Sequence, residues 1–579
     1  MREVPEKKGL MEVLFRKKVF HGNSHLDSPL KRCLTVIDVM FIAIGHMIGA
    51  GIYVLTGSVV RNQAGPSIVL SFLFSGIAAL LSALSYAEFG ARFPRAGSAY
   101  TYAYTSIGEL WAFIIGWTVP LEYMIGNAAV ARSWSSYFDT LFDHAIQNFT
   151  INTIGEFDVG GGFFSKYLDI LACVLVMLVA VAVAMGTKTS ARINLVFVTL
   201  NITILAFVIV TNLTYADFNN WFGTTSTGGS KFFPYGFSGT LSGASTCFFA
   251  FIGFEALATA GEEAKNPHRT IPIATICSLA VTFLIYMLMG ASLTLMMPYD
   301  EVNPNAAYAE AYRAKGANVA RIIMTVGALT GLINNLITGT FALPRAVYAM
   351  ADDGLIFSFL AKINKFTKIP LNAIILFTIL NAIMVLFFDL DALVEFLSIG
   401  TLSAYSIVSA SVVIMRYQPA PIKSDNPNKL EMDDGGSLRN WVPFRDFWDN
   451  QPAGRSICVG LFFLVVGYFW LAFTFRLEFH NTIPGYISLF FNVILILVAF
   501  LFILGHRENR LELSYKVPLL PWIPCFGLLI NVFMMVYLAL ITWVRLFVWL
   551  AVGLVIYFTY GIRHSKEARK SRVVATTSF

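Results

Sequence analysis

Apolar runs of about twenty residues recur along nearly the whole chain, and this pattern limits the fold more than any other feature. A helix of that length spans the roughly 30 Å hydrocarbon core of a bilayer. Hydrophobic residues make up 56% of the 579 residues and charged residues only 13%, with a mean hydropathy of +0.67. An ordinary soluble globular protein does not have this composition. Counting the runs predicts an all-α polytopic membrane protein with 14 transmembrane helices.

Basic residues gather before the first apolar run, at Lys7, Lys8, Arg16, Lys17, Lys18, Lys31 and Arg32. Lys and Arg are enriched in cytoplasmic segments of membrane proteins. We therefore expect a retained cytoplasmic N-terminus, with no cleavable secretory signal, and a cytoplasmic C-terminus. This orientation places most of the 41 Lys and Arg residues on the cytoplasmic side.

Several function classes are disfavoured. The formal charge of +6 reflects topology and not a basic soluble domain, so we expect no nucleic-acid partner. The six cysteines are scattered without metal-ligand spacing, which implies neither a disulfide nor a zinc site. A phosphate-binding loop, paired metal ligands and a nucleophile elbow are also missing from the sequence. We expect no enzyme, no cofactor and no bound metal, and a small solute and membrane lipid as the partners.

A polar stretch late in the chain divides the apolar runs into ten and four. We expect a cytoplasmic N-terminus, a ten-helix transport core, a cytoplasmic linker, four C-terminal transmembrane helices and a cytoplasmic tail over residues 1–34, 35–416, 417–455, 456–563 and 564–579. The core contains two halves of five spans. Since five is odd, the second half would enter the membrane with the opposite orientation, as in inverted-repeat transporters.

Each half of the core opens with an interrupted span. In the first, Gly49, Ala50 and Gly51 interrupt an apolar run, and glycine frees the backbone to unwind. Unwound backbone at membrane depth is tolerated only where it is buried in protein or lines a cavity. Amides at such a helix N-terminus favour an anion, which suits the carboxylate of an α-amino acid. The alternative is that these small residues only allow close helix packing.

The second interruption lies in span six, at Gly253 within a cluster of phenylalanines. Carbonyls near Ala250 and Phe251 would accept hydrogen bonds from an ammonium group, and Phe249 is a candidate gate. With 51 phenylalanines in the chain, ordinary packing is the alternative for each of them. Two corresponding breaks predict a binding site near the membrane midplane.

Two carboxylates accompany these breaks. Glu122 lies near the centre of span three, where an acid is costly and faces the bundle interior, so it either contacts a substrate cation or serves the structure. Glu255 follows the second break and either contacts substrate or caps freed amides. The charged run from Glu262 to Arg269 is a solvated loop or an inner gate. His46 is expected to be a packed histidine.

Long stretches resemble the cationic amino acid transporter family of the amino acid-polyamine-organocation superfamily. They include Gly49-Ala50-Gly51-Ile52-Tyr53, "AEFGARFPRAGSAYTY" from Ala87, "FAFIGFEALATAGEEAKNP" from Phe249, "LSIGTLSAYSIVSASVVIMRYQP" from Leu397 and "TWVRLFVWLAVGLVIYFTYGIRHS" near the C-terminus. The resemblance implies a LeuT-like 5+5 inverted-repeat core plus four C-terminal helices. It also implies transport of arginine, lysine and ornithine across the plasma membrane.

The resemblance assigns roles to single residues. Glu109 matches an acidic position important to transport in the family, and Glu122 is similar to bacterial members, whereas many animal members carry serine there. Asn201 replaces the lysine of proton-coupled bacterial relatives. Because an amide does not titrate, we expect transport without obligatory sodium or proton coupling. Gly339 stands where bacterial relatives selecting small neutral substrates carry methionine, so it either leaves room for a long side chain or only permits helix contact.

Two sequons, at Asn148 and Asn212, fall outside the membrane or at its outer edge, where we expect glycosylation. Together these features predict a carrier that moves cationic L-amino acids by alternating access. A broad or neutral amino acid carrier and a sensor that binds without transporting remain as alternatives. A lysosomal membrane remains the alternative location.

Overall fold

The computed structural model describes residues 10–18, 30–49, 51–142, 145–156, 164–165, 167–224, 229–303, 307–388, 399–423, 430–443, 445–449, 451, 454–477, 479, 482–538 and 540–569. Within these residues, eleven helical segments are long and apolar enough to cross a membrane. Three shorter apolar helices accompany them, Ile170–Ala184, Leu371–Phe387 and Trp522–Tyr537. The prediction of a helical polytopic membrane protein is confirmed.

The first part of the chain contains α1 (Leu10–Leu14), α2 (Val36–Met47), η2 (Gly51–Leu55), α3 (Thr56–Val59), η3 (Val60–Ala64), η4 (Gly65–Ser67), α4 (Ile68–Arg92), α5 (Ala99–Ser106), α6 (Glu109–Thr140), α7 (Ala145–Ile154), α8 (Ile170–Ala184), α9 (Thr187–Thr214) and η5 (Phe218–Asn220). Next come α10 (Gly236–Phe248), η6 (Phe249–Phe251), α11 (Ala256–Thr259), η7 (Ala260–Glu263), α12 (Pro267–Met296), η8 (Tyr299–Glu301), α13 (Ala307–Ala314), α14 (Asn318–Asp352) and η9 (Ser358–Ala361).

The last part contains α15 (Leu371–Phe387), α17 (Ile399–Arg416), β1 (Pro421–Lys423), β2 (Leu430–Met432), α18 (Arg445–Asp449), α19 (Arg455–Arg476), α20 (Ile483–Leu504), α21 (Trp522–Tyr537), α22 (Leu540–Ile556), η11 (Tyr557–Gly561) and α23 (Ile562–His564). The two strands pair antiparallel, with Pro421 opposite Met432. They lie in the segment expected to be a cytoplasmic linker.

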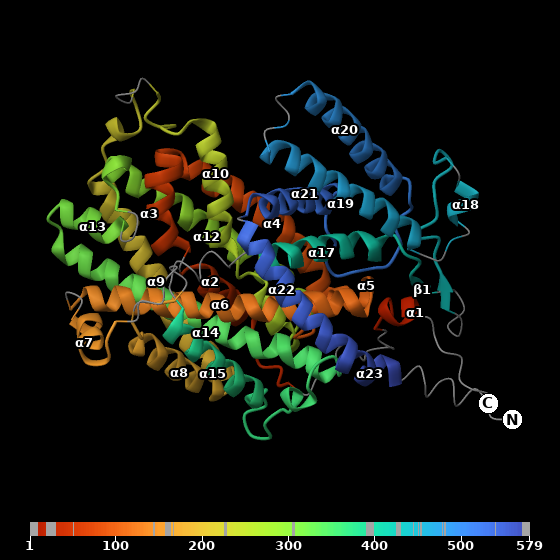
Figure 1. The fold of residues 1–579 in the computed structure, drawn as a ribbon, viewed down its shortest axis with the longest axis horizontal. Coiled ribbons are helices and arrows are strands. Elements are labelled where there is room, and N and C mark those ends of the chain that lie inside the picture. The colour runs from red at the N-terminus through yellow and green to blue at the C-terminus, as the bar shows by residue number, and fades with distance from the viewer. Residues whose placement is uncertain are drawn as a thin grey trace.

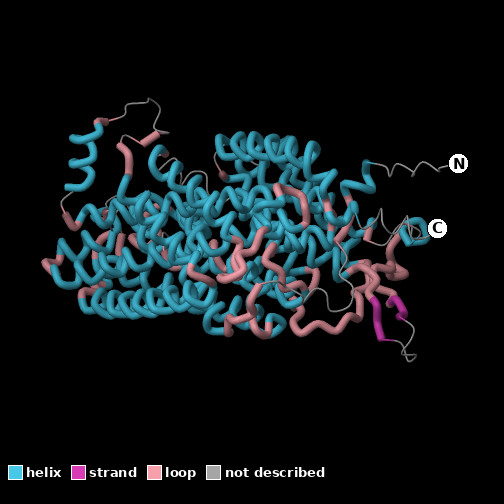
Figure 2. The backbone as a smooth tube through the Cα atoms, turned by 90° about the horizontal axis from the view of Figure 1, so that it is seen from below, coloured by secondary structure: helices cyan, strands magenta, loops and turns pink. Residues whose placement is uncertain are grey.

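Helices distant in sequence pack side by side to form the core. Helix α12 lies along α4, and α14 packs against both α6 and α9. Near the C-terminus, α19 packs against α20, and α21 packs against α17 (Figure 1). Helices α1 and α23 lie toward one end of the molecule, and α7 lies toward the opposite end (Figure 1). Figure 2 shows that helices make up most of the described backbone.

Local sequence explains where the first membrane helix begins. Thr35 and Asp38 form a capping box before α2, in which the Asp38 amide donates to Thr35 Oγ1 and the Thr35 amide donates to an Asp38 carboxylate oxygen. This arrangement satisfies amide groups that a helix N-terminus leaves without intrahelical partners. The helix then buries most of its residues until it stops at Met47, just before the glycine-rich break.

Candidate functional site

The first break separates α2 from η2, and its freed carbonyls receive side-chain donors from other helices. The Asn335 amide nitrogen donates to the His46 carbonyl, and the Tyr286 hydroxyl lies 2.6 Å from the Met47 carbonyl oxygen. Gly49 sits directly against Asn335, where an added Cβ would lie 2.8 Å from the Asn335 Cβ. Ala50, the middle residue of the predicted anion site, lies outside the described residues.

The second break follows η6 and turns at Gly253. This residue has a φ of +129°, a conformation that favours glycine, and an added Cβ would lie 2.9 Å from His46 Cγ. Its amide donates to Glu255 Oε2 over 2.9 Å. Glu255 therefore caps an amide that the break has freed.

The two breaks touch each other. A Cβ on Gly51 would lie 2.5 Å from the Cβ of Ala250, so only a glycine allows this approach. The Tyr286 hydroxyl reaches the Ala250 carbonyl oxygen at 2.9 Å as well as the Met47 carbonyl oxygen. Residues about 200 positions apart in sequence thus meet in the interior of the bundle.

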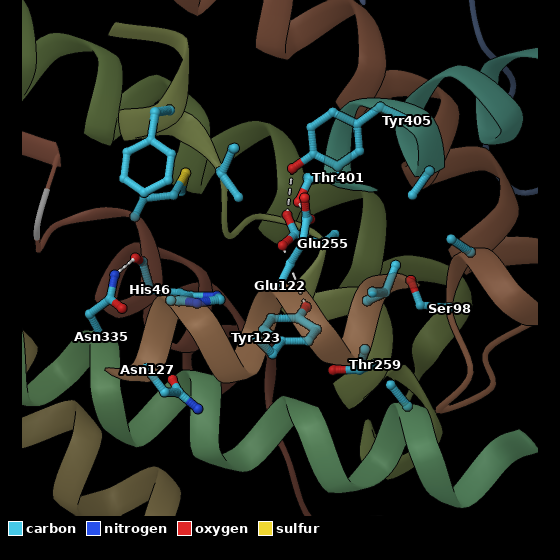
Figure 3. Close-up of a pocket in the computed structure, with 18 of the residues that line it drawn as sticks. His46, Ser98, Glu122, Tyr123, Asn127, Glu255, Thr259, Asn335, Thr401 and Tyr405 are labelled. Carbon is cyan, nitrogen blue, oxygen red and sulfur yellow. Dashed lines mark hydrogen bonds between the residues drawn. The ribbon is translucent and has the colours of Figure 1, made fainter. Parts of the chain in front are cut away.

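A cavity with about 1200 Å³ of empty space opens beside the meeting point. Gly51, Glu122, Phe249 and Glu255 line it, as the sequence-based prediction of a common site requires. Figure 3 shows its polar side chains, which come from several helices and converge on one space. The labelled ones are His46, Ser98, Glu122, Tyr123, Asn127, Glu255, Thr259, Asn335, Thr401 and Tyr405.

Five other predicted site residues do not line this cavity. Gly49 packs on Asn335, Ala250 on Gly51, and Gly253 on His46. Phe251 is buried, with its ring centre 5.1 Å from that of Tyr286. Gly339 lies behind Asn127, because an added Cβ would come within 2.0 Å of Asn127 Oδ1. These residues shape the site from behind the lining.

Two acidic side chains, those of Glu122 and Glu255, line the cavity. Glu255 accepts hydrogen bonds from the hydroxyls of Tyr405 (2.6 Å) and Tyr123 (3.4 Å), and Thr401 donates to Glu122 (Figure 3). Among the described residues that line the cavity, none is a lysine or an arginine. Two carboxylates without a basic lining residue favour a cation inside the cavity.

Asn201 lies away from the cavity and connects three elements. Its amide nitrogen lies 2.9 Å from the Tyr53 hydroxyl, 2.6 Å from the Gly327 carbonyl oxygen and 3.4 Å from Thr330 Oγ1. It thereby joins α9 to η2 and α14. An uncharged donor thus supports the turn that follows the first break.

Glu109 lies near the cytoplasmic end expected from the topology, where it holds both terminal segments. Its buried carboxylate accepts from the hydroxyls of Tyr104 (2.6 Å), Ser565 (2.7 Å) and Tyr557 (3.1 Å), and it pairs with Arg16 at 3.5 Å. Glu109 does not line the cavity, so its contacts give it a structural role, and the role in transport that the family resemblance implies stays a prediction.

The charged run after span six is divided: Glu262 and Glu263 are buried and paired, whereas Lys265, Asn266 and Arg269 are exposed. Glu263 forms an ion pair with Arg345 at 2.5 Å, and both side chains are at most 1% exposed. Glu262 pairs with Arg95 at 3.4 Å and accepts from the Ala96 amide at 2.7 Å. The paired glutamates are compatible with an inner gate, and the exposed second half of the run is compatible with a solvated loop.

The two sequons differ in exposure. Asn148 is exposed on α7, toward the end of the molecule opposite α1 and α23. Asn212 is fully buried in α9, where its amide nitrogen donates to Ser292 Oγ over 3.1 Å. An attached glycan would occupy that nitrogen, so the structure argues against the expected modification at Asn212.

Several residues that line the cavity or support the breaks were not predicted from the sequence. They include Asn127, Tyr286, Asn335, Thr401 and Tyr405. Polar residues inside apolar spans are rare and often functional, so Asn335 in "LINNLITG" carried a usable signal. Threonine and tyrosine are too common in membrane helices for a single one to indicate a functional site.

The chain is similar to known transporters over nearly its whole length. The amino acid permease family matches residues 34–432, and the family of amino acid permease C-termini matches residues 515–565. Cationic amino acid transporter 4 of Mus musculus is 39% identical over 96% of this chain and 91% of its own length. The Homo sapiens protein of the same name is 37% identical, over 95% and 90%. The mitochondrial cationic amino acid transporter 3 of Arabidopsis thaliana is 32% identical over 96% of both chains.

These families and relatives are transporters and not enzymes. The amino acid permease family matches well over half of the chain, and the relatives are similar over nearly all of it. The chain as a whole is therefore a transporter and not an enzyme. The chain belongs to the amino acid permease family and, within it, to the cationic amino acid transporters.

Proposed function

We propose that this protein moves cationic L-amino acids, namely arginine, lysine and ornithine, across the plasma membrane by alternating access. The observation that carries the proposal is the cavity beside the two touching breaks, which Glu122 and Glu255 line without a lysine or arginine among the described lining residues. The names of the relatives, which are cationic amino acid transporters, support the same substrate class.

The substrate carboxylate lies on the amides around Gly49 and Gly51, and the α-ammonium meets carbonyls of the second break. The cationic side chain extends toward Glu122. A membrane potential of about 100 mV, negative inside, favours entry of one positive charge by about 2.3 kcal/mol. Accumulation therefore needs no co-transported ion, in keeping with the neutral amide at Asn201.

The proposed architecture has fourteen spans: a 5+5 inverted-repeat core over residues 35–416 and four helices over 456–563. The eleven long apolar segments and three shorter apolar helices among the described residues are compatible with that number. Both termini face the cytoplasm, which the basic residues before the first span support.

Uptake of labelled L-arginine by proteoliposomes containing the full chain tests the proposal. Excess lysine and ornithine should compete, and leucine should compete much less. Equal competition by leucine would favour a broad or neutral carrier, and saturable binding without uptake would favour a sensor. Surface labelling of intact cells distinguishes the plasma membrane from the lysosomal membrane.

A further inference from the structure

The Tyr286 hydroxyl bridges the two breaks. It lies 2.6 Å from the Met47 carbonyl oxygen in the first break and 2.9 Å from the Ala250 carbonyl oxygen in the second. Tyr286 belongs to α12, a different helix from those that carry the breaks. One side chain from a third helix thus contacts both carbonyls.

A phenol has a single proton to donate, so Tyr286 satisfies only one of the two carbonyls at a time. A carbonyl oxygen has two lone pairs, so the carbonyl that does not receive the Tyr286 proton is a ready acceptor for another group. The α-ammonium of an amino acid carries three N–H donors. Its arrival would pair one of the two carbonyls while Tyr286 donates to the other.

The surroundings hold this hydroxyl in place. Tyr286 is fully buried, and its ring packs against Phe72 and Phe251, with ring centres 5.3 and 5.1 Å away. A Cβ on Gly51 would lie 3.3 Å from the Tyr286 hydroxyl. The close approach of Gly51 therefore also restricts where this hydroxyl can lie. Met47 and Gly51 both line the cavity, which brings the bridge to the edge of the proposed substrate space.

We infer that Tyr286 is a positioning residue of the amino-acid site, which sets the two carbonyls and leaves one to accept the substrate ammonium. This inference rests on the proposed function, because it requires an amino acid in the cavity. It predicts that Tyr286 matters for substrates with an α-ammonium and not for analogues that lack one.

The test compares Tyr286→Phe with wild type in proteoliposomes containing the full chain. L-arginine is the substrate, and its analogue without the α-ammonium, 5-guanidinopentanoic acid, is the competitor. Tyr286→Phe should raise the KM for arginine about tenfold, with a maximal rate within about twofold of wild type. The inhibition constant of the analogue should change by less than about twofold.

Tyr312→Phe is the matched control. Tyr312 is also fully buried, and its hydroxyl donates to a single backbone carbonyl, that of Val208, over 3.2 Å. Losing that bond should leave the arginine KM unchanged. A general effect of removing a buried hydroxyl would alter both variants alike and would overturn the inference.

An unchanged arginine KM in Tyr286→Phe, or an equal loss for arginine and the analogue, would also overturn it. If Tyr286→Phe does not fold, Phe251→Leu replaces it as the test variant. This change removes the ring that packs against Tyr286, so the Tyr286 hydroxyl is held less firmly. Phe251→Leu should raise the arginine KM about threefold with the analogue unaffected, and an unchanged KM would refute the inference. Failure of the proposed function is distinct, because it would appear in the wild type itself, as no uptake of L-arginine or as equal competition by L-leucine.

Discussion

The Asn201 amide nitrogen lies 2.9 Å from the Tyr53 hydroxyl, and this contact supports the first break with a group that carries no charge. Neither group changes its charge near neutral pH, so this position has no means of exchanging a proton with substrate movement. A membrane potential alone should drive accumulation. This relationship is the basis of our prediction that transport has no obligatory ion coupling.

We predict that proteoliposomes accumulate labelled L-arginine when a potassium diffusion potential is imposed. At about 100 mV, negative inside, the limiting accumulation is about 50-fold. A pH gradient or a sodium gradient imposed at zero potential should produce no uphill uptake. Uphill uptake driven by either gradient would contradict the absence of coupling.

Replacing Glu122 by Gln should weaken cationic substrates selectively. The change removes the negative charge and preserves the size of the side chain, which faces the cavity and accepts from Thr401. We expect the KM for L-arginine to rise about tenfold and that for L-leucine to change less than about twofold. Glu310→Gln is the control, because Glu310 lies in an exposed pair with Arg313. An unaltered preference for arginine over leucine would remove Glu122 from selectivity.

The sequence predicted the parts of the site that are anomalous in an apolar span. Gly51 and Glu122 stand out because glycine breaks helices and a buried acid is costly, and both line the cavity. From the sequence, Glu255 either contacts substrate or caps freed amides. In the structure it caps the Gly253 amide and also lines the cavity.

The sequence does not show which residues are partners of these ones, even where it marks a residue such as Asn335 as unusual. Thr401 and Tyr405 reach the site from α17, and Asn335 reaches it from α14, so their roles depend on how distant helices pack. Sequence spacing defines the face of one helix but not which helix lies opposite. The same limit applies to Gly339, whose contact with Asn127 emerges only from the packing of α14 on α6.

Gly339 should act on the substrate through Asn127. A Cβ at position 339 would lie 2.0 Å from Asn127 Oδ1, so a larger side chain must push Asn127, which lines the cavity. Gly339→Met should abolish arginine uptake and preserve part of the alanine uptake, since the smaller substrate needs less space. Adding Asn127→Ala should restore arginine uptake toward wild type. Equal loss of arginine and alanine uptake without rescue would indicate a folding defect.

N-linked glycosylation should occur at Asn148 and not at Asn212. Asn148 is exposed on α7, whereas Asn212 is fully buried and its amide nitrogen donates to Ser292. Enzymatic deglycosylation should shift the electrophoretic mobility of wild type and of Asn212→Gln equally. Asn148→Gln should migrate like the deglycosylated protein. A shift that persists in Asn148→Gln and disappears in Asn212→Gln would reverse this assignment.

Breaking the Glu263–Arg345 pair should destabilise the protein strongly. Both side chains are at most 1% exposed, and Arg345 also donates to the Phe341 carbonyl oxygen and to Thr187 Oγ1. Removing one partner leaves an uncompensated buried charge, which costs about 3–5 kcal/mol. Glu263→Gln should therefore lower the melting temperature of the purified protein far more than the exposed control Glu310→Gln.

The pair can also be replaced as a unit, which separates the cost of an unpaired charge from the value of the pair itself. The double variant Glu263→Met with Arg345→Met removes both charges and leaves apolar side chains of similar length. We expect it to melt above Glu263→Gln, because apolar replacement of a buried pair is often neutral or stabilising. A double variant that melts below Glu263→Gln would show that the bonds of Arg345 to Phe341 and Thr187 stabilise this region more than charge pairing does.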